Sequence, residues 1–339
     1  MAIGDGWPTL SELTKQFDPD GKTIAPVGEL LSYTNEILQD MPFYEANGST
    51  THRHTVDASI PRGTWRKLNY GIKPSKGKTA QVTDQIGLLE ARSEVDVVLA
   101  RMSNDIAKFR LNEDRRHLEG LNQDLAETLF YNDVSAHPER YLGLAPRYDS
   151  LGQPANVPSA NSQGMDHVLD AGGTTASKQS SIWLIGWGEN SVFGLYPQGS
   201  PAGMERQDLG EIDCLDADGG KFRGLATHYR IQQGLAVKDW RYIVRIANIE
   251  TTAAITSTVI DKVCDMMIDA TNAIPYLGAC RPVFYMNRAT KSRLQKAALR
   301  KTNMALGFED IYGIQNQLNI SSIPIKQCDS LMLTEAVVS

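Results

Sequence analysis

No apolar run in this 339-residue sequence approaches the roughly 20 residues that a membrane-spanning helix needs, so we expect no such helix. The first residues, MAIGDGWPTL, also lack the basic start and the apolar stretch of a secretory signal peptide. Only four cysteines are present, and none lies within four residues of another, so the zinc and redox pairs that closely spaced cysteines form are not expected. We predict reduced, mostly buried thiols in a protein that is made and kept in a cytoplasm.

Complete motifs for phosphate or calcium binding are also missing. The segment FDPDGKT at 17–23 ends like a phosphate loop, but Gln16 stands where that loop requires a glycine. The segment LDADGG at 215–220 begins like a calcium loop, but position 12 is Thr227 where a glutamate is needed. Both segments are interpreted as turns, the second as a tight turn between two strands.

Six histidines supply few candidates for chemistry. His52 and His54 share one side of an expected strand and could share a metal, but no third ligand lies near them in sequence. His117 is interpreted as a flank residue of a helix. His228 is the best single candidate for acid–base work, but no nucleophile motif or carboxylate pair accompanies it. We therefore expect no catalytic residue, no cofactor and no metal site.

The charge of the chain is unevenly distributed. Hydrophobic residues make up 41% and charged residues 22%, which is the balance of a folded globular protein. The formal net charge is −6, yet residues 41–80 carry +5 and the other 299 residues −11. A basic segment on an otherwise acidic protein indicates that this segment contacts a partner. The basic residues of this segment are Arg53, Arg62, Arg66, Lys67, Lys73, Lys76 and Lys78.

The N-terminal third predicts an arm followed by a hairpin. Residues 1–45 consist of short apolar fragments, with one helix expected over 28–39 before Pro42, and are interpreted as an arm rather than part of a core. Two extended runs, 50–72 and 78–94, flank the basic segment KPSKGK and predict a projecting β-hairpin. An isolated hairpin is only marginally stable in water, so we expect a neighbouring subunit to hold it.

A long helix is expected over 104–132. Its apolar face is marked by Leu111, Leu118, Leu121, Leu125 and Leu129. The second half, 117–133, contains the acidic residues Glu119, Asp124, Glu127 and Asp133 and no lysine or arginine.

The remaining segments mix strands and helices without a regular alternation, which predicts an α+β class. We expect a long surface loop over 149–181 with room for one edge strand, a buried strand at SIWLIGWG and a run VFGLYP that ends in a turn. An alternating strand RYIVRIANI and a helix over 251–274 are expected next. A strand RPVFYMN follows, then a basic helix capped by Asn287, and two short strands in the tail. The basic helix is interpreted as a solvated or subunit-facing surface, with Arg288, Lys291, Arg293, Lys296, Arg300 and Lys301.

Two blocks of sequence resemble a known family. FRLNEDRRHLEGLNQDLAETLFYND followed by PERYLGLAPRY is similar to the long-helix region of podovirus-type major capsid proteins of tailed bacteriophages. SIWLIGWGENSVFGLYPQGSPAGMERQDLGE and GLAVKDWRYIVRIANI are similar to the central lobe of the same family. This similarity implies that residues 181–210 form a buried strand pair that leads into a loop. The blocks cover about a third of the chain, and the other segments fit the order of the shell fold that tailed phages share with the herpesvirus capsid floor.

The resemblance implies domain boundaries and partners. It implies an N-terminal arm (1–45), an extended loop (46–95), a peripheral domain with a spine helix (96–149), an axial domain (150–310) and a C-terminal return to the peripheral domain (311–339). It further implies assembly into hexamers and pentamers of an icosahedral shell around double-stranded DNA, in a virion assembled in the host bacterial cytoplasm, with scaffold, cement and portal proteins as partners and no membrane. The expected intersubunit residues are Arg53, Arg62, Trp65, Arg66, Lys67, Lys73, Lys76 and Lys78 on the loop, and Glu119, Asp124 and Glu127 on the spine helix.

Three alternatives remain open at this point. A cellular nanocompartment shell would share the fold but enclose a cargo enzyme. A cytosolic α+β hydrolase would use His228 and form a small oligomer with a pocket. A phage tail or connector component would form rings or tubes in place of closed shells.

Overall fold

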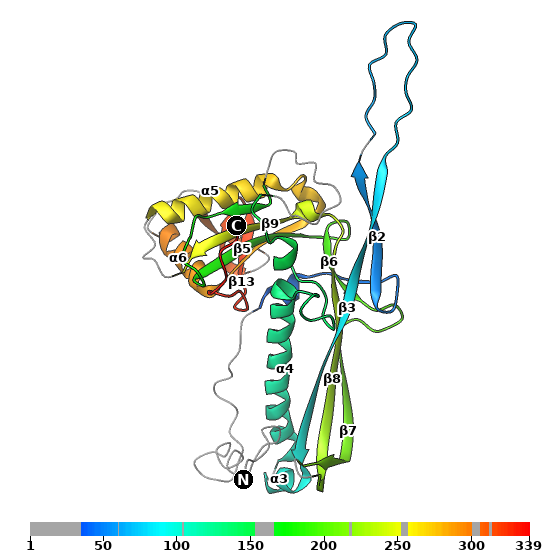
Figure 1. The fold of residues 1–339 in the computed structure, drawn as a ribbon. Coiled ribbons are helices and arrows are strands. Elements are labelled where there is room, and N and C mark those ends of the chain that lie inside the picture. Colours follow the sequence, from blue (N-terminus) through cyan, green and yellow to red (C-terminus); the bar gives the residue numbers. More distant parts are fainter. Residues whose placement is uncertain are drawn as a thin grey trace. The chain divides into compact units, whose positions relative to one another are not determined.

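A computed structural model describes residues 35–59, 61–103, 105–152, 166–216, 219–251, 257–299, 306–311 and 314–339 (Figure 1). Its residues divide into two compact units. The described residues of the first unit are those of Leu88–Leu125 and Ala202–Gln232. The second unit comprises Thr34–Gly87, Ala126–Pro201 and Gln233–Ser339. Three elements run from one unit into the other, namely β3 (Lys78–Asp96), α4 (Ile106–Tyr131) and β8 (Lys221–Val237).

The first unit combines a long hairpin with the N-terminal half of α4. Strand β7 (Met204–Leu215) pairs antiparallel with β8, and α3 (Val97–Met102) follows β3. The turn expected over 215–220 is confirmed at its described residues, since Asp216 N–H donates to the Gly220 carbonyl and Asp216 Oδ1 accepts from Gly220 N–H. Residues 217 and 218 lie outside the described residues. The expectation of a loop through 210 is wrong from Met204 onward. The side chains of β7 are mostly exposed and polar, so no apolar pattern announces the strand.

Helix α4 confirms the expected long helix, but its leucine face begins later than expected. Leu121 and Leu129 are buried, whereas Leu111 is 51% exposed. In the N-terminal half the covered face carries Phe109 and the polar run 112–114. Polar contacts across the first unit explain this burial: Asp114 Oδ2 accepts from Arg206 of β7, and Arg110 donates to Asp208 and Thr227.

The second unit is built on one sheet. Its order is β11 (Leu306–Ile311), β12 (Ile314–Ile320), β13 (Ile323–Gln327), β10 (Arg281–Met286), β5 (Gln179–Trp187), β6 (Val192–Tyr196), then β8. Strand β9 (Ile243–Glu250) also pairs with β5, β4 (Val168–Asp170) with β9, and β1 (Phe43–Glu45) with β6. Strand β2 (Thr51–Ser59) pairs antiparallel with β3 and forms the expected hairpin.

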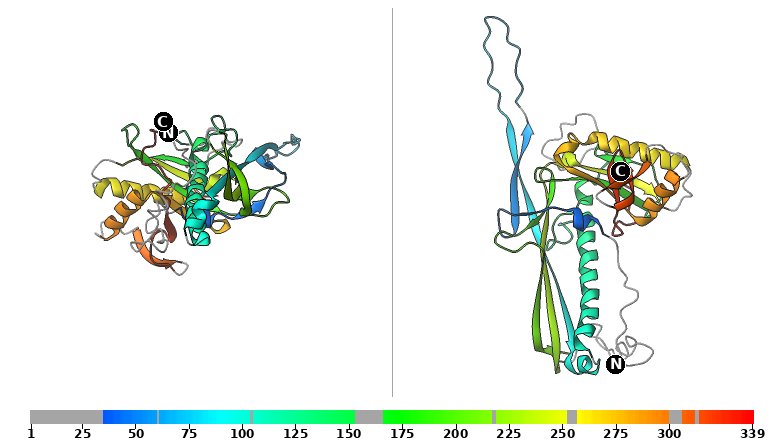
Figure 2. Two further views of the ribbon diagram at one scale, coloured as in Figure 1. Left: turned by 90° about the horizontal axis from the view of Figure 1, so that it is seen from below. Right: turned by 180° about the vertical axis from the view of Figure 1, so that it is seen from behind.

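Side chains of the central strands alternate between two cores, as expected for RYIVRIANI. On β5, Trp183 and Ile185 enter one core while Ile182 and Leu184 enter the other. On β9, Ile243 and Ala247 enter the first core, and Val244, Ile246 and Ile249 enter the second. Helices α5 (Ser257–Ala273) and α6 (Arg288–Leu299) cover the second core, as Figures 1 and 2 show. Strand β5 is therefore buried over its whole length, which identifies SIWLIGWG as architecture.

Residues 35–41 belong to the second unit's core, so the interpretation of 1–45 as an arm outside any core is wrong for this part. Helix α2 (Ile37–Asp40) ends before Pro42 as expected, and Ile37 and Met41 are buried in the first core. Residues 28–34 of the expected helix lie outside the described residues.

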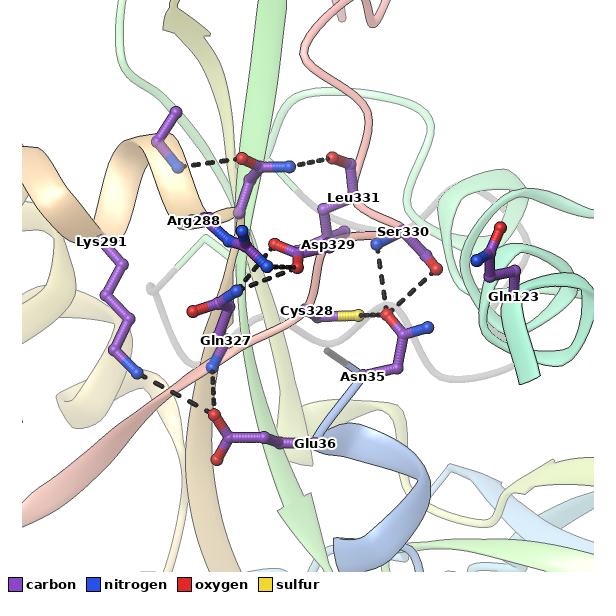
Figure 3. Close-up of polar contacts among 12 residues, drawn as sticks. Asn35, Glu36, Gln123, Arg288, Lys291, Gln327, Cys328, Asp329, Ser330 and Leu331 are labelled. Atoms are coloured by element: carbon purple, nitrogen blue, oxygen red, sulfur yellow. Dashed lines mark hydrogen bonds and ion pairs between the residues drawn. The ribbon is translucent and has the colours of Figure 1, made fainter. Parts of the chain in front are cut away.

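Polar contacts fasten this segment to the C-terminal part of the chain (Figure 3). Asn35 Oδ1 accepts from Cys328 Sγ and from the backbone N–H and hydroxyl of Ser330. Glu36 accepts from the backbone N–H of Gln327 and lies 3.9 Å from the Lys291 ammonium. Asp40, just beyond, accepts from Arg281, Tyr285 and Lys326. These contacts join segments almost 300 residues apart in sequence.

Candidate assembly surface

The loop that joins β2 to β3, residues 61–77, is named here the hairpin tip. It contains no strand, so the expected extended run 50–72 ends at Ser59. A single turn lies at Leu68–Asn69, where Tyr70 N–H donates to the Lys67 carbonyl and Asn69 has a positive φ of 67°. Residues 61–76 are all exposed. Figure 1 shows this stretch as a loop without arrows beyond β2 and β3. The tip has no core of its own within the described residues.

Large apolar side chains are concentrated on the hairpin tip. Trp65 is 101% exposed and Leu68 89%, and Tyr70 and Ile72 are also exposed. Single exposed apolar residues are ordinary on a protein surface, but a dense set of them indicates a surface for another protein. Trp65 was among the expected contact residues. Leu68 and Tyr70 were assigned only to the extended run and not to a contact.

Basic side chains surround these apolar residues. Among the described residues, no ion pair involves any of the seven expected cations: Arg53, Arg62, Arg66, Lys67, Lys73, Lys76 and Lys78. Arg53 lies on β2, where its backbone exchanges hydrogen bonds with the Asn47 side chain. The tip thus offers unpaired positive charge next to exposed aromatic rings. This combination fits an acidic, partly apolar protein surface.

The base of the hairpin, in contrast to its tip, is buried and polar. Asp84 of β3 is 3% exposed, and its Oδ1 lies 2.8 Å from Arg147 of the 3₁₀ turn Ala145–Arg147. His52 packs edge-on against Phe193 of β6, with ring centroids 5.9 Å apart. These contacts lie within the second unit and fasten the hairpin to the sheet. Sequence reasoning missed Asp84, whose only signal is a carboxylate at an inward position of an alternating strand.

The acidic residues expected to receive a basic hairpin all lie on α4. Asp124 and Glu127 are exposed, and Glu119 is half-buried, where it accepts a hydrogen bond from Gln123 Nε2 at 3.0 Å. No lysine or arginine occurs in the second half of this helix. The acidic face is thus available on α4, on a different element from the basic tip.

The histidine candidates for chemistry are placed as follows. His228 lies on β8 with Nε2 3.5 Å from Glu90, which in turn accepts from Arg230. The Arg230 hydrogen bond is the main cause that lowers the pKa of Glu90. His117 is half-buried on α4. Over the described ranges, no group of three or more His, Cys, Asp or Glu side chains has the geometry of a metal site.

Several of the remaining sequence candidates make contacts within the chain, whereas Lys296 of α6 is exposed. On α6, Arg288 pairs with Asp329, Arg293 donates to the Thr251 carbonyl, and burial lowers the pKa of Lys291. Asn287 caps this helix as expected, since its Oδ1 accepts from Ala289 N–H. All four cysteines are free thiols, and three are buried. The GKT segment and Arg300 and Lys301 lie outside the described residues. In the part of the chain that is described, no helix is long and apolar enough for a membrane span.

Comparison with known proteins gives four findings. The family described as "Major capsid protein GP7" matches residues 18–339. A chain of the bacteriophage Epsilon15 structure is 32% identical, with 99% of this chain and 98% of that chain covered and a TM-score of 0.73. The capsid protein of bacteriophage JBD30 is 10% identical over 89% of this chain and 93% of that chain, with a TM-score of 0.51, and shares the fold. No curated protein matches the sequence.

Proposed function

This chain belongs to the family of the major capsid protein GP7, and from that premise we propose that its copies assemble as hexamers and pentamers into an icosahedral shell around packaged double-stranded DNA. Family membership makes the chain a shell-forming structural subunit of a phage capsid and not an enzyme. It does not favour the nanocompartment, hydrolase or tail interpretations. The α+β capsid fold expected from the sequence is confirmed.

The observation that carries the assembly mode is the exposed, basic and apolar hairpin tip. The tip of one copy lies on a neighbouring copy, where its cations meet the acidic half of α4 with Glu119, Asp124 and Glu127. An exposed ion pair contributes only about 0–1 kcal/mol, whereas full burial of one large apolar side chain contributes about 1.5–3 kcal/mol. The apolar side chains therefore supply most of the affinity, and the charges supply orientation and rate.

Reversing two charges on the tip tests the electrostatic part. The double variant Arg66→Glu and Lys67→Glu is expected to assemble more slowly and less completely than the natural chain, most visibly at low salt, because salt screens exposed charges. Light scattering and negative-stain electron microscopy follow the yield of closed shells. The matched control Lys221→Glu and Arg223→Glu makes the same charge change on β8, at exposed positions. Equal assembly of the tip variant and the natural chain at low salt would contradict the proposal.

Truncating the aromatic anchor tests the apolar part. Trp65→Ala is expected to reduce shell yield about tenfold or more at a fixed protein concentration, because it removes an apolar contact worth about 1.5–3 kcal/mol per copy. Raising the salt should not restore assembly. Trp65→Phe, which keeps an apolar ring, should retain most of the yield. Shell formation by Trp65→Ala at the natural concentration would exclude Trp65 as an anchor.

The net negative charge outside residues 41–80 affects how the shell would interact with packaged DNA. The 299 residues outside 41–80 carry a net charge of −11. An acidic inner wall would hold packaged DNA without binding it, because like charges repel. We extend the proposal to scaffold, cement and portal proteins as partners and to assembly in the host bacterial cytoplasm, and we retain the peripheral (96–149) and axial (150–310) boundaries on the same basis.

A further inference from the structure

Four polar side chains form a group at the base of the hairpin, named here the base cluster: His54 and Asp84, which are buried, and His52 and Arg147, which are half-buried. All four belong to the second unit. His54 is 8% exposed and Asp84 3%. Asp84 Oδ1 pairs with Arg147 at 2.8 Å, and the two imidazole rings lie 5.9 Å apart, centroid to centroid. Three of its members lie on the hairpin itself, so the state of the cluster bears on how the hairpin is held.

Hydrogen bonding in the base cluster is incomplete. Within the described residues, both ring nitrogens of His54, Asp84 Oδ2 and Arg147 Nε are buried without a hydrogen bond of ordinary geometry. A backbone hydrogen bond with Val237 is the smallest of the causes that act on the pKa of His54, and it raises that pKa. His54 Nδ1 lies 3.6 Å from Asp84 Oδ2, which is too long for a hydrogen bond. Most buried polar atoms in proteins have a hydrogen-bond partner of ordinary geometry, and these four atoms do not. Adding a proton to a group with such atoms is therefore expected to change the free energy of the closed hairpin base strongly.

We propose that the base cluster is a proton-sensitive anchor: with both histidines neutral, the Asp84–Arg147 pair holds the hairpin base to the sheet, and protonation of His52 and His54 opens it. The charges facing the cluster favour this outcome. Asp84 of β3 is the one carboxylate that acts on both histidines, while the cations are Arg147 from the 3₁₀ turn and Lys238 after β8. Two protonated histidines would add two positive charges to a group in which one carboxylate already pairs with Arg147.

The pH range follows from the direction of the shifts. Burial lowers the pKa of His54, and Asp84 offsets this only in part; burial likewise lowers the pKa of His52. Because the closed state binds protons more weakly than the open state, the closed state is fully favoured above the ordinary histidine pKa of about 6.5 and loses stability as the pH falls below it. Each histidine can raise the opening constant by up to about tenfold per pH unit below that value.

Local opening of the base is a property of the second unit alone, but its consequence for assembly rests on the proposed function. A tip that must lie on a neighbouring copy needs a fixed base. Acidification would then release the hairpin and weaken contacts between copies, although residues 61–77 of the tip contain no histidine, aspartate or glutamate.

Hydrogen exchange of the unassembled full chain tests the anchor. Protection of amides in 51–54 and 82–87, corrected for intrinsic exchange, is compared between about pH 7.5 and about pH 5.5, with β10 as the internal reference. We expect the opening constant at the base to rise about tenfold to a hundredfold relative to β10. The comparison with β10 is needed because burial also lowers the pKa of His167, which affects the second unit as a whole.

The double variant His52→Asn and His54→Asn should lose this selective pH dependence, while His137→Asn, at an exposed histidine, should keep it. A pH dependence that persists in the double variant, or none in the natural chain, would overturn the proposal. If the double variant does not fold, NMR titration of the natural chain with labelled histidines tests the proposal instead. A His54 pKa at or above about 6.5 would overturn the proposal. Failure of the tip variants to affect assembly would refute the proposed contact and leave this exchange result unchanged.

Discussion

Replacing Glu335 with alanine is expected to lower the free energy of unfolding of the second unit by about 3–5 kcal/mol. Glu335 is 6% exposed, and its Oε2 accepts from Arg245 at 2.8 Å and from the Ser181 hydroxyl. Its Oε1 accepts from Tyr131. The alanine variant leaves the Arg245 guanidinium, 5% exposed, without a counter-charge. An unpaired buried charge of this kind costs far more than the net contribution of the pair.

Denaturant unfolding followed by tryptophan fluorescence measures this loss, because Trp183 is fully buried and lies 5.2 Å from Arg245. The control Glu139→Ala removes an exposed carboxylate near Arg140 and should change stability by no more than about 1 kcal/mol. The double variant Arg245→Met and Glu335→Leu, which removes both charges, should lose much less than Glu335→Ala. Equal losses in Glu335→Ala and Glu139→Ala would show that the buried pair does not hold the C-terminal segment.

The elements predictable from the sequence are those whose burial leaves a local pattern. Strand β5 is a continuous apolar run, β9 alternates between two cores, and α4 repeats leucines at helical spacing. Strand β7 was missed because its side chains are mostly exposed and polar, so its pairing with β8 imposes no apolar period. The expectation that Leu111 lies on the buried face of α4 is wrong for a related reason. The face of α4 that packs in the first unit is held by ion pairs such as Arg206–Asp114, and periodicity of apolar residues does not report these.

The residues of the candidate site also differ in whether the sequence reveals them. The tip could be predicted because its five cations and Trp65 are neighbours in sequence, and composition alone reveals such a group. Its anchor could not be predicted, since Asp84 and Arg147 are 63 residues apart and nothing in the sequence indicates that they pair. The same holds for Arg245 and Glu335, 90 residues apart, which look like ordinary surface charges until the fold brings them together.

Alanine at position 143 is expected to destabilise the second unit by about 3 kcal/mol, because a methyl group there meets backbone that has little freedom to move. An added Cβ would lie 2.9 Å from the Asn132 nitrogen, 2.9 Å from the Thr128 carbonyl oxygen and 3.0 Å from the Phe130 carbonyl carbon. Gly143 follows the end of α4, and its N–H donates to the Asn132 carbonyl at 2.8 Å. Relief of the contact would break this bond or shift the last turn of the helix.

The same substitution at position 120 should have the opposite sign, which separates backbone crowding from any general effect of glycine replacement. Gly120 is exposed within α4, and an added Cβ meets nothing within 4 Å. Alanine there is expected to stabilise the helix by about 0.5–1 kcal/mol, because glycine loses more backbone freedom on folding. Denaturant unfolding followed by far-UV circular dichroism measures the free energy of unfolding of both variants. If Gly143→Ala proved as stable as the natural chain, the close packing of segment 141–144 against the end of α4 would be refuted. Only that packing gives the two substitutions opposite effects on the free energy of unfolding.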